Sequence, residues 1–357
     1  MAEIDHEVVI DAEDTDHSES ELEVWYSTNA IQLFQSVASS TTSLSASILE
    51  YRVENGRTYH HYKDGKYVMP NDETEWERLD FQHEITVYTL DGRLGVAPPN
   101  DVGSKVGRVL DLGCGTGSWA MDFGDLHPES EVYGVDLTPV RADFVPPNVK
   151  FEIDDLEEDW TYTQPFDYIH SRFMSAAIDD WDKYIKQCYD NLAPGGYLEL
   201  HEAELMAKSD DGLLPEDAAV IKWVKLLNEA SERTGRVFVS APPMKTKMLE
   251  AGFVDVELRM YKWPHNSWPK DERYKKLGAW TLENFGSALE ATCMAAFTRV
   301  LGWTRDEVNV FLIDVRNDLK NKSYHSYCPV YCITGRKPEK EKTPPVPQEE
   351  TEAEDGA

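Results

Sequence analysis

The fold of this chain is decided by the stretch Val109-Leu110-Asp111-Leu112-Gly113-Cys114-Gly115-Thr116-Gly117. Its apolar residues form the short run that is typical of a buried parallel strand, and its alternate glycines allow a sharp turn close to a ligand. Residues 119–123 continue with helical spacing, so the free N–H groups at the start of that helix would face the space over the turn. The pattern predicts a strand, a turn and a helix that together bind a nucleotide.

The surroundings of the turn indicate which nucleotide it binds. Residues 131–136 have the pattern of a second strand that ends in Asp136, and a carboxylate at this distance meets ribose hydroxyls in a β-α-β unit. Two features disfavour NAD: the glycines follow G-x-G-x-G instead of G-x-G-x-x-G, and Asp111 lies two residues before the first of them. A carboxylate there attracts the amino group and the sulfonium of S-adenosylmethionine, but it gains nothing from a pyrophosphate.

Four motifs in order resemble those of class I S-adenosylmethionine-dependent methyltransferases, namely residues 111–117, Asp136, residues 151–156 and residues 194–199. Two upstream stretches, residues 49–60 and 71–80, resemble the fungal LaeA-like methyltransferases, which are regulators and tailoring enzymes of secondary metabolism. The resemblance implies S-adenosylmethionine as the cofactor. It also implies an α/β, Rossmann-like fold with a seven-stranded, mostly parallel sheet flanked by helices.

The order of patterns along the chain predicts four segments. The methyltransferase domain spans residues 101–336 and holds a helical insert over residues 263–323, part of which would form a substrate wall before the last strand. Residues 25–100 would form an N-terminal helical cap and lid. The acidic residues 1–24 and the Pro/Glu-rich residues 337–357 are expected to be disordered tails, because they hold too few apolar residues to bury surface.

Hydrophobic periodicity places the remaining elements. Further strands are predicted at residues 149–153, 166–170, 197–201, 252–258 and 327–334, and helices at residues 73–90, 182–192, 216–232 and 244–251. The strand that starts at Gly252 is expected to be antiparallel and to pair with the final strand.

The resemblance also implies a set of residues that contact the cofactor. These are Tyr62, Asp111, Gly113, Cys114, Gly115, Asp136, Leu137, Asp155, Leu156 and His170. The family's adenine contact maps to Asp155 by its offset from Phe151, and Asp154 is the neighbouring alternative. Tyr62 belongs to the tyrosine-rich residues 51–69, which would close over the methionine end of the cofactor; a partly buried aromatic cluster is the alternative interpretation.

Histidines supply the candidate general bases. Methyl transfer is an in-line displacement that depends mainly on positioning, and it requires a base only if the acceptor holds a proton at neutral pH. His201 and His170 end two predicted strands and are the candidate catalytic residues, with His83 and His265 as further candidates if the caps fold inward. A structural or substrate-shaping role for His201 is the alternative, because the neighbouring Glu202 points to the opposite face of a strand.

No metal site is predicted. His325, Cys328 and Cys332 have the side chains of metal ligands. On an extended strand, however, the two cysteines would lie about 13 Å apart, too far to share a zinc ion with bonds of about 2.3 Å.

Charge and composition restrict the partners of the protein. The two tails carry −10 and −4 of the net charge of −31, which leaves −17 on residues 25–336. An acidic body without a basic stripe repels phosphate, so direct binding of nucleic acid is disfavoured. Five cysteines without regular spacing indicate a reducing compartment, and no apolar run reaches membrane-spanning length. We therefore expect a cytoplasmic protein, with the nucleus as the alternative.

Two functions fit these observations. The first is an enzyme that methylates a small secondary metabolite, with oxygen as the favoured acceptor atom. The second is a LaeA-like nuclear regulator that binds S-adenosylmethionine and acts through partner proteins, for which the two charged tails would be suitable contacts. The sequence does not identify the methyl acceptor.

Overall fold

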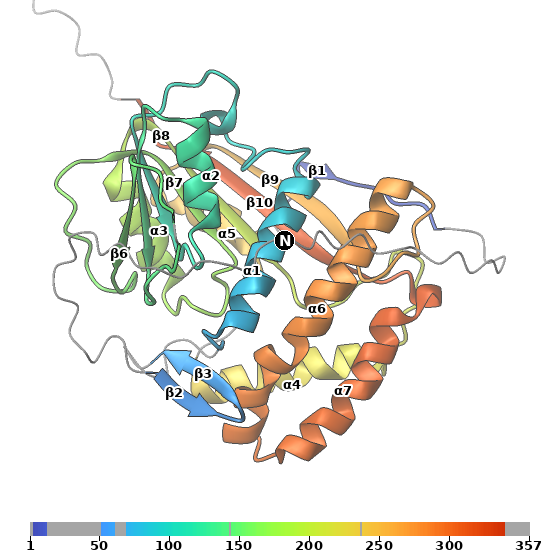
Figure 1. Ribbon diagram of the computed structural model, residues 1–357. Coiled ribbons are helices and arrows are strands. Elements are labelled where there is room, and N and C mark those ends of the chain that lie inside the picture. The colour runs from blue at the N-terminus through green and yellow to red at the C-terminus, as the bar shows by residue number, and fades with distance from the viewer. Residues whose placement is uncertain (1–2, 13–50, 61–68, 143, 236–237, 340–357) are drawn as a thin grey trace, which may run out of the picture.

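A central sheet of eight strands organises the computed structural model (Figure 1), which describes residues 3–12, 51–60, 69–142, 144–235 and 238–339. From one edge to the other, the strands are β1 (His6–Glu7), β9 (Val254–Pro264), β10 (Tyr327–Arg336), β8 (Leu192–Ala203), β7 (Phe166–Arg172), β4 (Arg108–Leu112), β5 (Glu131–Asp136) and β6 (Val149–Ile153). Strands β4 to β8 pair in parallel, and β10 is antiparallel to both of its neighbours. The α/β fold class is confirmed.

Two details of the predicted sheet are wrong. The sheet has eight strands instead of seven, because residues of the acidic N-terminal segment pair in parallel with β9 as β1. Asp5 accepts a hydrogen bond from Leu258 N at 2.7 Å and pairs with Lys245, so the acids that suggested disorder fix residues 3–12 in place. The predicted antiparallel sixth strand, β9, is antiparallel only to β10 and runs in the same direction as the parallel strands.

Helices cover both faces of the sheet, because β4 presents alternate residues to opposite sides. Val109 packs on one face with Trp119 and Phe123 of α2 (Ser118–Leu126), and α1 (Glu73–Thr89) lies outside α2. Leu110 and Leu112 pack on the other face with α3 (Trp181–Asn191) and α5 (Pro242–Ala251). All four helices agree with the predicted ranges to within a few residues.

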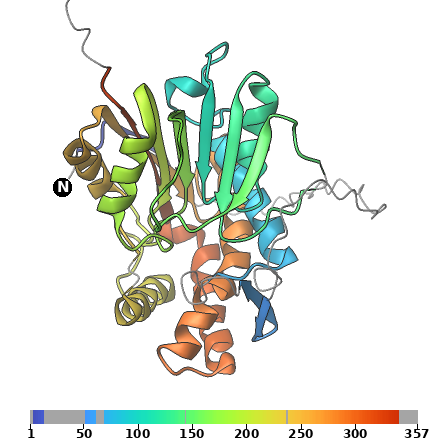
Figure 2. The ribbon, with the colours of Figure 1, turned by 90° about the vertical axis from the view of Figure 1, so that its left-hand side faces the viewer.

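Three further helices form a second core beyond the sheet, as Figures 1 and 2 show. They are α4 (Ala219–Thr234), α6 (Glu272–Arg299) and α7 (Arg305–Lys320). Their apolar stripes meet in one cluster, which buries Val224, Leu289, Phe297 and Leu312. The predicted insert is therefore helical, but its first part, including Trp263, belongs to β9.

A hairpin replaces part of the predicted helical cap. It consists of β2 (Tyr51–Glu54) and β3 (Arg57–His60), and Arg299 at the end of α6 holds it through Glu54 at 2.9 Å. Short 3₁₀ turns occupy Pro98–Asn100 and Lys322–Tyr324. Residues 25–50 and 61–68 of the predicted cap, which include the proposed lid residue Tyr62, lie outside the described residues.

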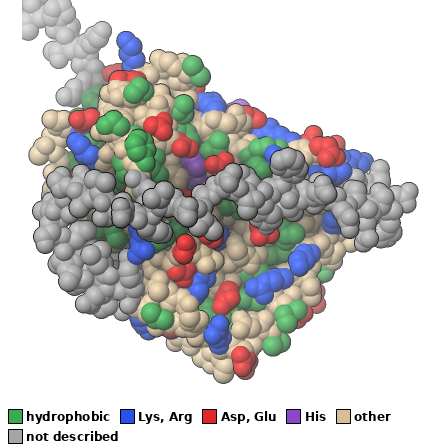
Figure 3. Space-filling view, in the orientation of Figure 1, with side chains coloured by type: hydrophobic (Ala, Val, Ile, Leu, Met, Phe, Trp, Pro, Cys, Tyr) green, Lys and Arg blue, Asp and Glu red, His purple; other side chains and the backbone are tan. Residues whose placement is uncertain are grey.

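The described part of the surface in Figure 3 carries acidic and basic side chains interspersed with each other. Among the described residues, no helix has both the length and the apolar character that a bilayer crossing requires.

Candidate active site

One continuous pocket lies at the carboxyl ends of β4, β5, β7 and β8, between the sheet and the helices α1, α4 and α6. Ligands bind at this edge in open parallel sheets, because the loops that leave the strands converge there. The cofactor half is lined by Gly113, Cys114, Gly115, Asp136, Leu137, Asp155 and Leu156. The structure thus brings seven of the ten predicted cofactor residues to one wall.

Asp136 shapes the glycine turn from the end of the neighbouring strand. Its Oδ2 atom accepts a hydrogen bond from Gly115 N at 2.9 Å, while Oδ1 accepts from the backbone N and the hydroxyl of Thr138. Gly113 and Gly115 have φ values of 67° and 55°, a region that favours glycine. The carboxylate therefore holds the turn and still faces the pocket, where its remaining lone pairs can accept from a ribose diol.

A methionine side chain lies close over the glycine turn. A Cβ atom added at Gly113 would lie 2.3 Å from Met174 Sδ, so the side chain of Met174 packs directly over the turn. Glu202 fixes that residue, because its carboxylate accepts hydrogen bonds from Met174 N at 2.9 Å and Ser175 N at 3.1 Å. As expected, Glu202 and His201 point to opposite faces of β8.

Asp155 lies at the opposite end of the cofactor half. Its side chain lines the pocket and accepts a hydrogen bond from Glu157 N at 3.1 Å. Asp154 instead accepts from Asp155 N at 2.8 Å, and its side chain is absent from the pocket lining. This geometry favours Asp155 over Asp154 as the adenine contact, which stays a prediction.

Asp111 and His170 lie beneath the turn and do not line the pocket. Asp111 Oδ1 is 2.7 Å from His170 Nδ1, and the His170 ring stacks on Trp119 at 3.8 Å. Burial raises the pKa of Asp111 to about 7, while burial and the facing His201 hold the pKa of His170 well below its ordinary value. The expected direct contacts of both residues with the cofactor do not fit this geometry; the pair supports the turn from below.

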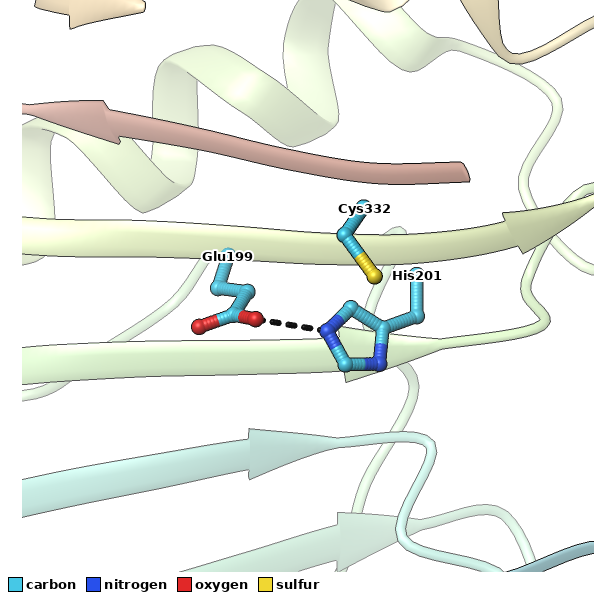
Figure 4. Close-up of side chains that lie close together, drawn as sticks. All are labelled: Glu199, His201 and Cys332. Atoms are coloured by element: carbon cyan, nitrogen blue, oxygen red, sulfur yellow. Dashed lines mark hydrogen bonds and ion pairs between the residues drawn. The ribbon is translucent and has the colours of Figure 1, made fainter. Parts of the chain in front are cut away.

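His201 is also displaced from the expected catalytic position. Its ring is fully buried, and Nε2 donates to Glu199 Oε1 at 2.6 Å (Figure 4). A base must reach the acceptor directly or through one water molecule, and neither His201 nor His170 reaches the pocket. A structural role for His201 therefore fits the geometry better than a catalytic role. The sequence placed His201 at the end of a strand, and that position does not decide how deeply its side chain is buried.

Glu199 is the buried centre of this region. It accepts hydrogen bonds from Val96 N at 2.7 Å, Ala97 N at 2.9 Å and the Tyr168 hydroxyl at 2.8 Å, in addition to His201. Burial alone would raise the pKa of this carboxyl, but the bonds from His201 and the two backbone N–H groups lower it to about 2.

Cys332 of β10 stands opposite His201, and its ligand atom lies within 4.8 Å of those of Glu199 and His201 (Figure 4). These three residues are the only such group in the part of the chain that the structure describes. A metal does not fit them well, because both Glu199 oxygens already accept several hydrogen bonds. Burial also holds the pKa of the Cys332 thiol well above its ordinary value, so it stays protonated.

The other two candidate bases are also engaged elsewhere. His83 Nε2 lies 2.9 Å from Asp122 Oδ2, and His83 Nδ1 accepts from the guanidinium of Arg172. His265 is buried beside Ser326, at 3.1 Å, and burial lowers its pKa to about 4. Neither ring lines the pocket.

The other half of the pocket, here called the acceptor half, extends between the sheet, α4 and α6. Its walls are mainly apolar and aromatic, and they include Phe173, Ala203, Leu205, Trp223, Phe238, Phe285 and Ala288. Arg78 and Asn284 add polar groups, and Arg78 is held in a double hydrogen bond by Glu75. Residues of the 263–323 insert line this part of the pocket, and their role as a substrate wall stays a prediction; Trp223 comes from α4, whose helical pattern gave no sign of a place in the lining.

The fold and the pocket define the class of the protein. A parallel strand turns through three glycines beside an acid at the end of the next strand, and Cβ atoms added at Gly113 and Gly117 would collide with Met174 and Phe151. A continuous apolar chamber beside the turn provides space for a methyl acceptor. These are the features of a class I S-adenosylmethionine-dependent methyltransferase.

Comparisons with known proteins agree with this class. A family model described as "Methyltransferase domain" matches residues 81–258. Methyltransferase pytC of Aspergillus terreus is 41% identical over 84% of this chain and 92% of that protein. The probable methyltransferase tdiE of Emericella nidulans is 34% identical over 83% of this chain and 92% of that protein. The secondary metabolism regulator laeA of Aspergillus fumigatus is 35% identical over 80% of this chain and 76% of that protein. The chain belongs to this LaeA-like family of methyltransferases, and its cofactor is S-adenosylmethionine.

Replacing Asp136 is expected to weaken cofactor binding without unfolding the protein. Asp136→Ala removes a charge-assisted contact worth about 2–3 kcal/mol, which corresponds to about 30- to 150-fold in affinity. Calorimetric titration with S-adenosylhomocysteine measures the change. The control is Glu131→Ala, which removes an exposed carboxylate from the other end of β5. An unchanged affinity in Asp136→Ala would rule out its assignment to the ribose.

Proposed function

We propose that this protein methylates a small, largely apolar secondary metabolite in a fungal biosynthetic pathway, with oxygen as the acceptor atom. The observation that supports the proposal is the continuity of the pocket: the glycine turn and the aromatic chamber between the sheet, α4 and α6 share one cavity. The relatives pytC and tdiE are named as methyltransferases, and laeA as a regulator of secondary metabolism.

The chain's own residues catalyse the transfer mainly by position. When bound, S-adenosylmethionine supplies a methyl group on a positively charged sulfur. Asp136 and Asp155 fix the two ends of the cofactor half, and the apolar walls exclude water from the acceptor. A wall of flat rings favours an acceptor that is itself flat and aromatic, because ring faces and edges attract each other.

The residues of the described lining favour an acceptor that needs no base from the protein. Within the described ranges, the pocket lining holds no His, Lys or Tyr, and its acids are Asp136, Asp155 and Glu157 at the cofactor end. Burial raises the pKa of the Cys114 thiol well above its ordinary value, so Cys114 is not a base at neutral pH either. An acidic hydroxyl, such as a carboxyl group or an acidic phenol, fits such a site because it arrives already ionised.

The proposal is tested with labelled S-adenosylmethionine and an extract of a producing fungus. Label transferred to a small molecule supports the biosynthetic function, and its chromatographic isolation identifies the acceptor. Label that appears only on protein, or no transfer at all, contradicts it and favours the regulatory alternative, which the identity to laeA makes the second candidate. Protein partners and a cytoplasmic location stay predictions.

Filling the acceptor chamber should separate its function from that of the cofactor half. Ala288→Trp places a large ring among the lining residues, so turnover of the identified acceptor is expected to fall at least about 100-fold while S-adenosylhomocysteine still binds. The matched control is Ser287→Trp, at the exposed neighbouring position of α6. Equal turnover in the two variants would place the acceptor elsewhere.

A further inference from the structure

Arg172 brings a positive charge to the boundary between the two halves of the pocket. It is the last residue of β7, and the preceding residue Ser171 pairs in register with Leu112, just before the glycine turn. Alternation along the strand puts Arg172 on the same side of the sheet as His170, two residues earlier. Arg172 lines the pocket, whereas His170 does not.

A chain of hydrogen bonds holds the guanidinium in place. Its Nη1 and Nη2 atoms each lie 3.2 Å from His83 Nδ1. Arginine only donates, so Nδ1 must accept, and the proton of the neutral ring is on Nε2, 2.9 Å from Asp122 Oδ2. The imidazole therefore connects the cation on β7 to a carboxylate on α2 and orients the guanidinium.

No carboxylate of the described residues forms an ion pair with Arg172. Burial lowers its pKa to about 10 despite the attraction of Asp111 and Asp122, so the group still carries its charge at neutral pH. The other arginine in the lining, Arg78, differs because the carboxylate of Glu75 accepts from it at 2.6 Å. A partly buried cation without an adjacent anion is costly, and an anionic ligand offsets that cost.

We propose that Arg172 is the carboxylate-binding group of this pocket, positioned by His83 and Asp122. Arginine suits the role because its fork of N–H groups donates two parallel hydrogen bonds to a carboxylate. The carboxylate has two chemical sources: the methionine end of the cofactor, or an acid group on the methyl acceptor. The inference rests on the proposed function only in that both ligands occupy this pocket.

The first experiment tests the cofactor as the source. Calorimetry compares S-adenosylhomocysteine with 5′-deoxy-5′-(3-aminopropylthio)adenosine, the same molecule without its carboxylate. The wild-type protein is expected to prefer S-adenosylhomocysteine by about 30- to 150-fold. Arg172→Gln removes this preference, and Arg172→Lys, which keeps the charge but not the fork, restores part of it.

The second experiment tests the acceptor as the source. With S-adenosylhomocysteine bound, 2-naphthoate and 2-naphthamide serve as flat probes of similar shape, of which only the first carries a carboxylate. A preference for the acid that disappears in Arg172→Gln, with binding of S-adenosylhomocysteine unchanged, assigns the carboxylate to the acceptor.

The proposal is overturned if folded Arg172→Gln and Arg172→Lys keep the wild-type preference in both pairs of ligands, or if the wild-type protein shows none. Circular dichroism and the unfolding temperature verify that the variants are folded, and Arg172→Lys keeps the test valid if Arg172→Gln is not. Both experiments measure binding and not turnover, so their results can be interpreted even if the protein does not methylate a metabolite.

Discussion

A Gly113→Val variant is expected to lose more than about 100-fold in affinity for S-adenosylhomocysteine. The new Cβ would lie 2.3 Å from Met174 Sδ and 2.9 Å from Met174 Cε, so the methionine must move. Its backbone is held by the carboxylate of Glu202 and its side chain lines the pocket, so we expect the side chain to move into the cofactor space. A β-branched residue also strains the backbone at a φ of 67°.

The matched control for this variant is Gly103→Val. Gly103 has a φ of 80°, but an added Cβ meets nothing within 4 Å. Both variants therefore carry the backbone cost of about 1–2 kcal/mol, and only Gly113→Val displaces Met174. Titration calorimetry measures the affinities of the two variants, and thermal unfolding measures how much stability each loses through its strained backbone. Equal affinities in the two variants would show that the turn does not face the cofactor.

Glu199→Ala is expected to destabilise the fold by about 3–5 kcal/mol, because it removes the anion of a buried charged network. The N–H groups of Val96 and Ala97 and the Nε2–H of His201 would lose their acceptor inside the protein. Denaturation by urea measures the loss, with Glu152→Ala on the exposed side of β6 as the control. A loss below about 1 kcal/mol would contradict the network.

The same carboxylate should make stability depend on pH. The pKa of Glu199 is lowered to about 2 in the folded protein from an ordinary value of 4.5. A depressed carboxyl pKa stabilises the fold above the unfolded value, so this contribution is complete above about pH 5 and is lost as the pH falls from 4.5 towards 2. In Glu199→Ala, the acid-dependent loss of stability over this range should be smaller than in the wild-type protein.

Local sequence patterns were sufficient for most of the parallel sheet. The strands at residues 131–136 and 149–153 were predicted with the observed limits, because apolar runs and turn residues are coded within each segment. The first strand was missed, because residues 3–12 carry no strand pattern and are fixed by distant partners, such as Lys245 for Asp5. The composition of a segment reflects only its own residues, and it does not reveal which basic side chains from elsewhere in the chain the segment contacts after folding.

The site was predictable where a motif fixes the backbone, and not where only side-chain direction decides. Gly113 and Asp136 line the pocket because the turn itself forms its wall. His170 and Arg172 share one face of β7, yet the imidazole is buried against Trp119 and the guanidinium reaches the ligand space. Trp223 joins them from α4 through packing that connects distant parts of the chain, which one sequence does not reveal.

The short strand β1 also bears on how the protein can be shortened. It covers part of the outer edge of β9, where Arg259 and Met260 would otherwise present unpaired backbone groups. Glu7 also forms a salt bridge at 2.9 Å with Lys262, whose side chain is only 3% exposed. A recombinant version that begins at residue 13 would expose a strand edge that can pair with a second molecule and lower the solubility of the protein. That loss of solubility would then be mistaken for a catalytic defect.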